Sequence, residues 1–262
     1  NRQDMLALIE RHQTLLARAE QASEKRRARF RERGQLTPRE RLSHLLDPGM
    51  PFLELYGMAN FQVDTTDPEK SVPGGNSICG IGFVRGVRCA IMVDDSGIDA
   101  GAMKPMTLTK GLGVMGIALR QKLPLIHLVE SAGANLMEYQ VELWADGGGI
   151  FCQLARLSAA GIPTIAVLHG PSTAGGAYMP GMSDYTIAVK DRGMAALAGP
   201  ALLYAATGEM AKEQELGGAE MHATVSGLAE YLAEDDGDAL RIARDLVCLL
   251  YTSPSPRDLS TS

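Results

Sequence analysis

Apolar residues recur along this chain in patterns that predict helices first and strands later. From Met5 to about Arg33 they return at helical spacing among many charged residues, which predicts a helix with a charged outer face. Gly34 is expected to end this helix, because glycine commonly follows the last helical residue. Thr37, followed three residues later by Glu40, has the spacing of a capping box and predicts a second, shorter helix.

From residue 78 onward the chain contains short apolar runs. The runs 78–84 and 87–93 flank Arg85 and Gly86 and predict a β-hairpin. Further apolar runs predict strands at 125–129, 164–168 and 185–189. Amphipathic segments predict helices at 107–121, 149–160 and 239–247. Strands separated by helical crossovers pair in parallel, so the sequence predicts an α/β protein.

Two turns of small residues follow neighbouring predicted strands. One is Ser131–Ala134, after the strand 125–129, and the other is the segment 169–180, which contains Gly175 and Gly176. The carboxyl ends of parallel strands meet at one edge of a sheet, where α/β proteins bind ligands, so both turns are expected to open on the same side. A glycine pair there lets backbone N–H groups approach an anion, or it permits close packing of strand on helix.

Composition narrows the class of protein. With 262 residues, 45% hydrophobic and 21% charged, the chain is long enough to bury a full core. Its net charge of −6 argues against nucleic acid as a main partner, and its apolar stretches are too short to span a membrane. The four cysteines have no paired spacing, so the sequence predicts neither a disulfide framework nor a zinc site.

The segment from Lys25 to Arg41 is basic within this acidic protein, since it holds one lysine and seven arginines. A solvated helix face accounts for such a run of charge. Recognition of a phosphorylated carrier, such as a thioester with a nucleotide tail, is the alternative interpretation.

Five separated blocks extend over most of the chain between Arg31 and Val247: RERGQLTPRERLSHLLDPG, PGGNSICGIGFVRG, LPLIHLVESAGANL, GPSTAGGAYMPGMSDYTIAV and LAGPALLYAATGEMAKEQELGGAEMHATVSGLAEYLAEDD. In this order they resemble the carboxyltransferase β subunits of biotin-dependent acyl-CoA carboxylases. Each block alone is a modest signal, but the ordered set of five is specific.

This resemblance implies a crotonase/Clp-protease-like fold, a superhelix of ββα units, and the chain is similar to the first of two such domains. It implies an N-terminal helical extension over residues 1–49 and the carboxyltransferase N-terminal domain, on the acyl-CoA side, over 50–247. Residues 248–262 change abruptly to Ser, Thr and Pro and match nothing in the family. They are expected to be an unrelated disordered tail, either joined artificially to a truncated gene or a natural linker.

The resemblance also implies a reaction, the transfer of a carboxyl group from carboxybiotin to the enolate of an acyl-CoA. Gly175 and Gly176 match the oxyanion hole that stabilises the negative thioester oxygen. The small residues expected to lie along the substrate are Ser131, Ala132, Gly133, Ala134, Ala174 and Ala177. The ESAGANL block and the glycine run 147–149 are similar to carboxylases of branched unsaturated acyl-CoAs, the geranyl-CoA type among them.

Biotin is the implied cofactor, carried on a partner α subunit that contains biotin carboxylase and the biotin carrier, and no metal is expected on this chain. The family's β subunits form hexamers, in which a second oxyanion hole and the biotin pocket come from the C-terminal domain of a neighbouring subunit. The chain alone is therefore expected to bind acyl-CoA weakly and to turn over no substrate. Its expected location is the cytoplasm, or the mitochondrial matrix in a eukaryote.

Two other functions stay open. A crotonase-type enoyl-CoA hydratase or isomerase would use the same glycine turn but would need a carboxylate aimed at the substrate, and Glu130 and Glu138 are the candidates. The second alternative is a non-catalytic assembly domain of a carboxylase complex.

Three further motifs favour no chemistry of their own. Lys104 lies in a sequence similar to a biotin attachment site, but Pro105 interrupts the match. Ser172 lies near His169 but lacks the G-x-S-x-G context and an evident acidic partner, so a hydrolase triad is disfavoured. His169 is instead expected to end a buried strand and to bond locally. The histidines also lack the paired spacing of metal ligands.

Overall fold

A computed structural model of the protein describes residues 1–134 and 141–251. Its main sheet consists of β1 (Leu53–Leu55), β2 (Ser77–Val84), β3 (Val87–Asp94), β4 (Leu125–Val129), β5 (Thr164–Leu168), β7 (Tyr185–Val189) and β9 (Tyr231–Ala233). The strands lie in the order β1-β2-β3-β4-β5-β7-β9. β1, β2 and β3 pair antiparallel, and every later pair is parallel. The α/β class predicted from the sequence is therefore confirmed.

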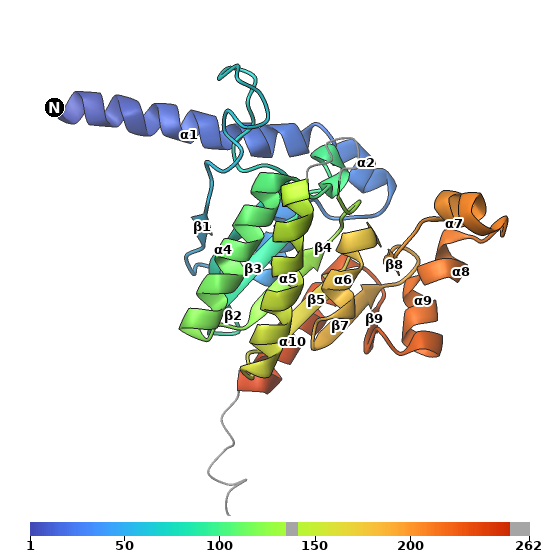
Figure 1. Cartoon of the computed structure of the whole chain (residues 1–262). Coiled ribbons are helices and arrows are strands. Elements are labelled where there is room, and N and C mark those ends of the chain that lie inside the picture. The colour runs from blue at the N-terminus through green and yellow to red at the C-terminus, as the bar shows by residue number, and fades with distance from the viewer. Residues whose placement is uncertain (135–140, 252–262) are drawn as a thin grey trace, which may run out of the picture.

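Helices cover both faces of this sheet (Figure 1): α4 (Pro105–Gln121) and α5 (Val141–Ala159) on one face, α3 (Pro38–Leu45) and α10 (Asp236–Tyr251) on the other. The apolar core is divided in the same way. Leu108 and Ile150 belong to the cluster beneath α4 and α5, whereas Leu42 and Leu240 belong to the cluster beneath α3 and α10. The central strands β4, β5 and β7 therefore bury side chains on both faces, which explains their nearly continuous apolar sequences.

The short helix α6 (Tyr178–Gly181) packs on the same face as α4 and α5. The remaining elements are α1 (Arg2–Glu24), α2 (Arg27–Glu32), β6 (Pro171–Thr173), β8 (Met194–Ala196), α7 (Pro200–Thr207), α8 (Glu213–Gly217) and α9 (Ala219–Met221). Short 3-10 turns cover Asp99–Gly101 and Ala174–Gly176, and a π-helical turn covers His222–Ser226. β6 and β8 form a separate two-stranded parallel sheet. The N-terminal half of α1 projects away from the rest of the molecule (Figure 1).

Several predicted elements coincide with the observed ones. The strands predicted at 125–129, 164–168 and 185–189 are β4, β5 and β7, and the predicted hairpin is β2 and β3. The capping box is also confirmed, because the Thr37 side chain accepts from the Glu40 N–H and the Glu40 carboxylate accepts from the Thr37 N–H. These elements have local sequence signals that no tertiary contact overrides.

The single helix predicted over 5–33 is wrong, since the structure has two helices with a turn at Lys25 and Arg26. The backbone leaves helical geometry at Arg26, with φ −100° and ψ 2°. Buried side chains lie on both sides of this turn: Ser23, which donates to Asp95 Oδ1 at 2.8 Å, and the ring of Phe30.

Two helices are longer than the sequence predicts. α5 begins at Val141 and so includes Gly147 and Gly148, which we expected to precede it. α10 ends at Tyr251, so it includes residues 248–251 of the predicted tail. No proline or glycine interrupts this end of α10 until Pro254, which explains why the helix continues past residue 247. Residues 252–262 lie outside the described residues.

Candidate functional site

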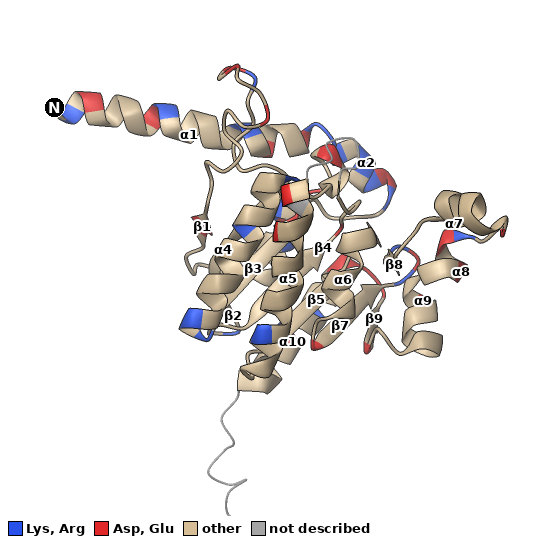
Figure 2. Ribbon diagram, viewed as in Figure 1, with Lys and Arg blue, Asp and Glu red and all other residues tan. Residues whose placement is uncertain are grey.

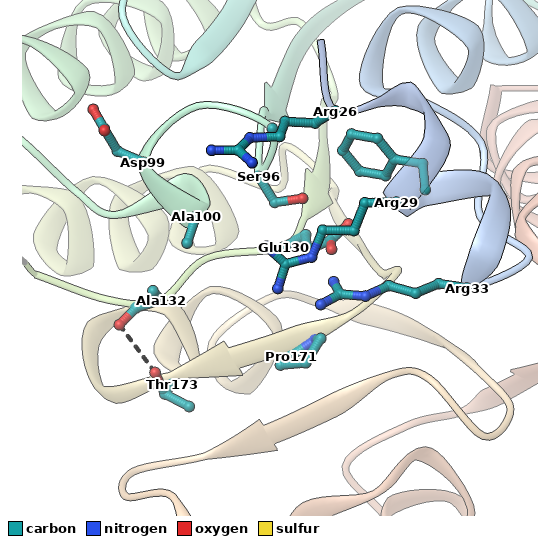
Figure 3. Close-up of a pocket in the computed structure, with 12 residues that line it drawn as sticks. Arg26, Arg29, Arg33, Ser96, Asp99, Ala100, Glu130, Ala132, Pro171 and Thr173 are labelled. Atoms are coloured by element: carbon teal, nitrogen blue, oxygen red, sulfur yellow. Dashed lines mark hydrogen bonds between the residues drawn. The ribbon is translucent and has the colours of Figure 1, made fainter. Parts of the chain in front are cut away.

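The two turns of small residues lie against each other at the carboxyl ends of β4 and β5. The Thr173 N–H donates to Ser131 O at 3.0 Å, and Thr173 Oγ1 donates to Ala132 O at 3.0 Å (Figure 3). β4 and β5 are parallel neighbours, so their ends are held at the same edge of the sheet. The expectation that both turns open on one side is confirmed.

A third segment, which follows β3, completes this edge. Ala132 N–H donates to Ala100 O at 3.2 Å, and Ser131 Oγ donates to Gly101 O at 2.9 Å. The backbone at Ala100 has a φ of 52°, an unfavourable conformation for a residue with a side chain, next to the permissive Gly101 at 67°.

The sequence patterns described above did not predict this third segment. β3 pairs in parallel with β4, so its end lies at the same edge as the two turns. Gly97 and Gly101, which follow the predicted hairpin, were the signal that could have identified it. At Gly101 a Cβ atom would lie 2.3 Å from Glu130 O, so only glycine lets the two segments approach this closely.

The two adjacent glycines of the second turn have different surroundings. A Cβ atom on Gly176 would lie 3.0 Å from the Cβ of Ser131, so packing explains that glycine. A Cβ atom on Gly175 would meet only the Met103 side chain, at 3.9 Å, and its backbone φ is not positive. Neither packing nor conformation requires glycine at 175, where the missing side chain leaves open space in a cavity.

A basic cavity of about 590 Å³ lies on one side of the turns. Arg26, Arg29 and Arg33 extend into it from α2 and its flanks, and Glu130 lies behind them (Figure 3). Pro171 forms part of its floor. In Figure 2, α2 carries a dense group of basic residues. Three guanidinium groups that converge on one cavity form a binding site suited to a phosphate or another anion.

An apolar cavity of about 330 Å³ lies on the other side. Its outer wall comes from α5 and from the residues at and before α7: Trp144, Gly147, Gly148, Ile150, Phe151, Leu197, Ala198, Gly199 and Leu202. Its inner wall comes from the small residues of the turns and from Met103. None of the described residues that line it is ionisable. This cavity suits a hydrocarbon group.

The two cavities share a wall. Ala132 and Thr173 line both of them, and the hydrogen bond between these residues closes the wall. An elongated ligand that crossed this wall would place one end among arginines and the other among apolar side chains.

The predicted oxyanion-hole and substrate residues divide into two groups. Ala132, Ala134, Ala174 and Gly175 line the apolar cavity. The others support the turns from behind: Ser131, Gly133, Gly176 and Ala177. Ser131 and Gly176 line only a small internal cavity of about 30 Å³.

A cluster of buried ionisable side chains lies behind the two turns. Arg41 is fully buried and donates to Glu130 Oε2 at 2.6 Å and to Asp236 Oδ2 at 3.1 Å. Asp236 Oδ1 lies 2.8 Å from His169 Nδ1. Burial, together with the charge of Arg41, lowers the pKa of His169. Burial opposes ionisation of Asp236, but the contacts with His169 and Arg41 outweigh it and hold the pKa of Asp236 well below its ordinary value.

This cluster corrects one sequence interpretation. His169 is buried directly after β5, as predicted, but it has an acidic partner, Asp236, which comes from α10. The two residues are 67 positions apart, so sequence spacing could not reveal the pair. Ser172 is also fully buried, and its hydroxyl oxygen accepts from Ser131 N–H at 3.4 Å, which leaves it no access to a substrate.

The other candidate groups offer no separate chemistry. Lys104 forms an ion pair with Asp99 at 2.6 Å. Within residues 1–134 and 141–251, no group of three or more His, Cys, Asp or Glu side chains could hold a metal ion. Glu138, a candidate carboxylate for hydratase chemistry, lies outside the described residues. None of the described helices is long and apolar enough to cross a bilayer.

Comparison with known proteins assigns the family. Residues 29–259 match the family model of the carboxyl transferase domain. The chain belongs to this family. The match confirms the resemblance found in the sequence blocks, and it includes the three arginines at 29, 31 and 33 as well as both turns.

Relatives with similar sequences are carboxylase subunits. The chain is 50% identical over 226 residues to a probable biotin-dependent acyl-coenzyme A carboxylase beta2 subunit of Mycobacterium tuberculosis, an alignment that covers 85% of this chain and 41% of that protein. It is 44% identical over 240 residues to the biotin-dependent 3-methylcrotonyl-coenzyme A carboxylase beta1 subunit of the same organism, covering 90% and 44%. The chain thus spans less than half the length of these relatives.

Solved structures show the same fold. The beta subunit of Pseudomonas aeruginosa geranyl-CoA carboxylase aligns with a TM-score of 0.86 and 46% identity, covering 94% of this chain and 45% of that chain. The transcarboxylase 12S hexamer, solved with methylmalonyl-coenzyme A bound, aligns with a TM-score of 0.82 and 29% identity, covering 94% and 47%. The predicted crotonase-like carboxyltransferase fold is therefore confirmed.

Proposed function

We propose that this chain forms the acyl-CoA side of a biotin-dependent acyl-CoA carboxylase. The phosphates of coenzyme A would bind in the basic cavity, the acyl group in the apolar cavity, and the thioester at the wall between them. The observation that carries this proposal is the shared wall of Ala132 and Thr173, which joins an arginine-lined cavity to an apolar one. An acyl-CoA has the matching order of groups along its length.

The proposed chemistry is stabilisation of a thioester enolate. Removal of a proton from the α-carbon, or from the γ-carbon when the acyl group is α,β-unsaturated, develops negative charge on the thioester oxygen, and preorganised backbone donors stabilise that charge. Gly175 is the position that we favour for such a donor, since its missing side chain opens toward the apolar cavity. Gly176 supports the turn by its close packing on Ser131.

Carboxybiotin on a partner subunit would supply the carboxyl group when bound. We assign none of the described residues to biotin, because neither cavity combines an apolar surface for its rings with paired polar groups for its ureido edge. We also propose that the chain alone turns over no substrate. The biotin side of the site would come from outside the described residues.

The acyl group that we propose is branched, unsaturated and bulky, as in geranyl-CoA. Gly147 and Gly148 lie inside α5, where glycine is unfavourable by about 1 kcal/mol relative to alanine. Both line the apolar cavity, and a Cβ atom at either position would meet nothing within 4 Å. The resulting space, together with 46% identity to the geranyl-CoA carboxylase beta subunit, supports a large acyl group.

Hydratase chemistry is less well supported. The Glu130 carboxylate is 2% exposed and accepts from Arg41, so it is engaged as the partner of a buried cation. A general acid or base must instead reach the substrate and exchange its proton. We therefore favour enolate stabilisation over hydration at this site.

We propose further that the subunit assembles with copies of itself and with a biotin-carrying partner. Large exposed apolar side chains near the apolar cavity support such an interface: Trp144, Tyr178, Leu197, Leu202 and Tyr204. Two proteins with the same fold, a carboxylase beta subunit and a hexameric transcarboxylase core, also support it. If the chain served only in assembly, its cavities would bind no ligand. A measurement of ligand binding therefore distinguishes an assembly function from a catalytic one.

The test is a calorimetric titration of the full chain with coenzyme A. We expect the wild type to bind, and we expect Arg29→Gln combined with Arg33→Gln to weaken binding about 100-fold, because two charge-assisted contacts to phosphate are lost. The control is Arg27→Gln with Arg31→Gln. These arginines lie on the same helix but pair with Glu40 outside the cavity. Equal affinity in both double variants would exclude the basic cavity as the phosphate site.

A further inference from the structure

Arg41 joins three parts of the chain that are distant in sequence. It lies on α3 with no exposed surface, and its guanidinium contacts Glu130, directly after β4, and Asp236, at the start of α10. The planar fork of arginine allows both carboxylates to be bound at once, which a lysine cannot do in the same geometry. The cluster thus fixes the position of α3 relative to the carboxyl edge of the sheet.

Each carboxylate leads to one of the two ligand-facing turns. Glu130 immediately precedes Ser131, and its side chain lies so close to Gly170 that a Cβ atom there would be 2.7 Å from Glu130 Cδ. Asp236 contacts His169, the first residue after β5. Arg41 therefore acts on the residue directly before each turn: it binds Glu130 itself, and it reaches His169 through Asp236.

The same cluster reaches the basic cavity. The Arg41 guanidinium lies over the ring of Phe30, 5.9 Å from its centroid, and Phe30 and Glu130 both line that cavity. Gln35, in the connection after α2, donates to His169 O at 3.2 Å. The arginine-bearing helix and the two turns are thus attached to one buried group of side chains.

Stability alone is a poor explanation for this cluster. Within the described part of the chain, three of its buried polar atoms have no hydrogen-bond partner: Gln35 Oε1, Arg41 Nη2 and His169 Nε2. Buried ion pairs are often no more stabilising than apolar residues of the same volume, and unpaired buried polar atoms add a further cost. A polar cluster with unpaired atoms is expected where its side chains hold a functional site in position.

We propose that Arg41 is a positioning residue. It holds the turns 131–134 and 170–176 in register with each other and with α2, so that the basic and apolar cavities meet at Ala132 and Thr173. The identity of the ligand that binds at these turns rests on the proposed function, but the positioning role of Arg41 does not. Without the forked contact, the hydrogen bonds between the two turns would remain, but the turns would lose their attachment to α3 and to the arginines of α2.

The test compares two ion pairs on the same helix. In one variant Arg41→Gln is combined with Glu130→Gln, which keeps the net charge and removes the pair. The matched control combines Arg39→Gln with Glu54→Gln, a two-bond pair that also starts from α3, with contacts of 2.7 and 3.1 Å. Amide hydrogen exchange is measured across the full chain, and coenzyme A affinity is measured by calorimetry.

We expect the Arg41 and Glu130 variant to exchange faster at 131–134 and 170–176 while the hairpin β2–β3 keeps its protection. Coenzyme A should bind about tenfold more weakly, as expected from the loss of about one charge-assisted contact. The control should change neither quantity. Unchanged exchange in both turns, or faster exchange spread evenly over the whole sheet, would overturn the positioning role.

Two further results keep the test decisive. If the double variant does not fold, Arg41→Lys replaces it, because lysine keeps the buried charge but cannot hold both carboxylates in a fork. Wild-type exchange and affinity in Arg41→Lys would reject the proposal. If the wild type itself does not bind coenzyme A, the proposed function fails, whereas the exchange of the two turns still decides the role of Arg41.

Discussion

The two cavities share one wall but differ in how their outer walls are built. The basic cavity takes its charged residues from α2 and from the segment after β3, and Glu130 lies at its base. The apolar cavity takes its lining from α5 and from the residues at and before α7. Figure 2 shows the same contrast, with basic residues concentrated on α2 and few charged residues on α7. The small residues of the turns let a ligand come close to the backbone. The surrounding helices determine which chemical group each cavity accepts.

The largest effect is expected from a substitution in the wall that both cavities share. Gly133 has a φ of 78°, and a Cβ atom there would lie 2.6 Å from Thr173 O. Gly133→Ala should lower the free energy of unfolding by about 3 kcal/mol, because steric overlap adds to backbone strain. Urea denaturation measures this loss, and coenzyme A and acyl-CoA affinities should fall together.

Gly161→Ala is the matched control for that variant. Gly161 also has a positive φ, of 68°, but nothing lies within 4 Å of its expected Cβ atom. Only the backbone cost of about 1 kcal/mol should remain. If both variants lost the same free energy, close contact between the turns would not be the reason for Gly133.

Elements with strong local signals could be predicted from the sequence. β4, β5 and β7 are continuous apolar runs, and the helix after Thr37 has its own capping residues. The turns at 131–134 and 174–177 could be found because small residues follow those strands. What they bind could not be derived from spacing, and the family resemblance supplied that expectation.

The remainder of the site depends on contacts between distant residues. Arg41 contacts Glu130 and Asp236, 89 and 195 positions away, so no local pattern marks the cluster. The basic segment left two interpretations open, since sequence does not show which arginines face solvent. In the structure Arg29 and Arg33 line the cavity, whereas Arg27 and Arg31 pair with Glu40. The two arginines of each pair are four residues apart, so each pair lies on its own face of α2.

A smaller effect is expected from a substitution that changes the apolar cavity alone. Gly148→Leu should fill part of the apolar cavity and weaken binding of a bulky branched acyl-CoA about tenfold relative to coenzyme A itself. Coenzyme A without an acyl group should bind as it does to the wild type. Paired titrations of the two ligands measure the difference.

Gly148→Ala is the control for side-chain size. It should raise the free energy of unfolding by about 0.5 to 1 kcal/mol, since it removes a glycine from the interior of α5. It should leave both affinities close to those of the wild type. An equal loss of coenzyme A and acyl-CoA affinity in Gly148→Leu would contradict the separation of the two cavities.

The last prediction concerns pH and the buried pair of His169 and Asp236. The folded pKa of His169 is lowered by burial and by Arg41, whereas the unfolded value is ordinary, about 6.5. As pH falls below that value, the unfolded chain binds a proton that the folded chain does not. Stability should therefore decrease between pH 7 and 5, approaching about 1.4 kcal/mol per pH unit from this residue. Asp236, whose folded pKa is lowered, loses its contribution only below about pH 4.

Replacement of His169 isolates this contribution. His169→Asn should flatten the dependence of unfolding free energy on pH between 7 and 5 by about 1 kcal/mol per unit, measured by urea denaturation at each pH. His44→Asn, at an exposed histidine of α3, should retain the wild-type slope. In the same range the affinity difference between acyl-CoA and coenzyme A should stay constant, because no ionisable group among the described residues lines the apolar cavity. Identical slopes for His169→Asn and the wild type would mean that His169 binds its proton equally well in the folded and unfolded chains.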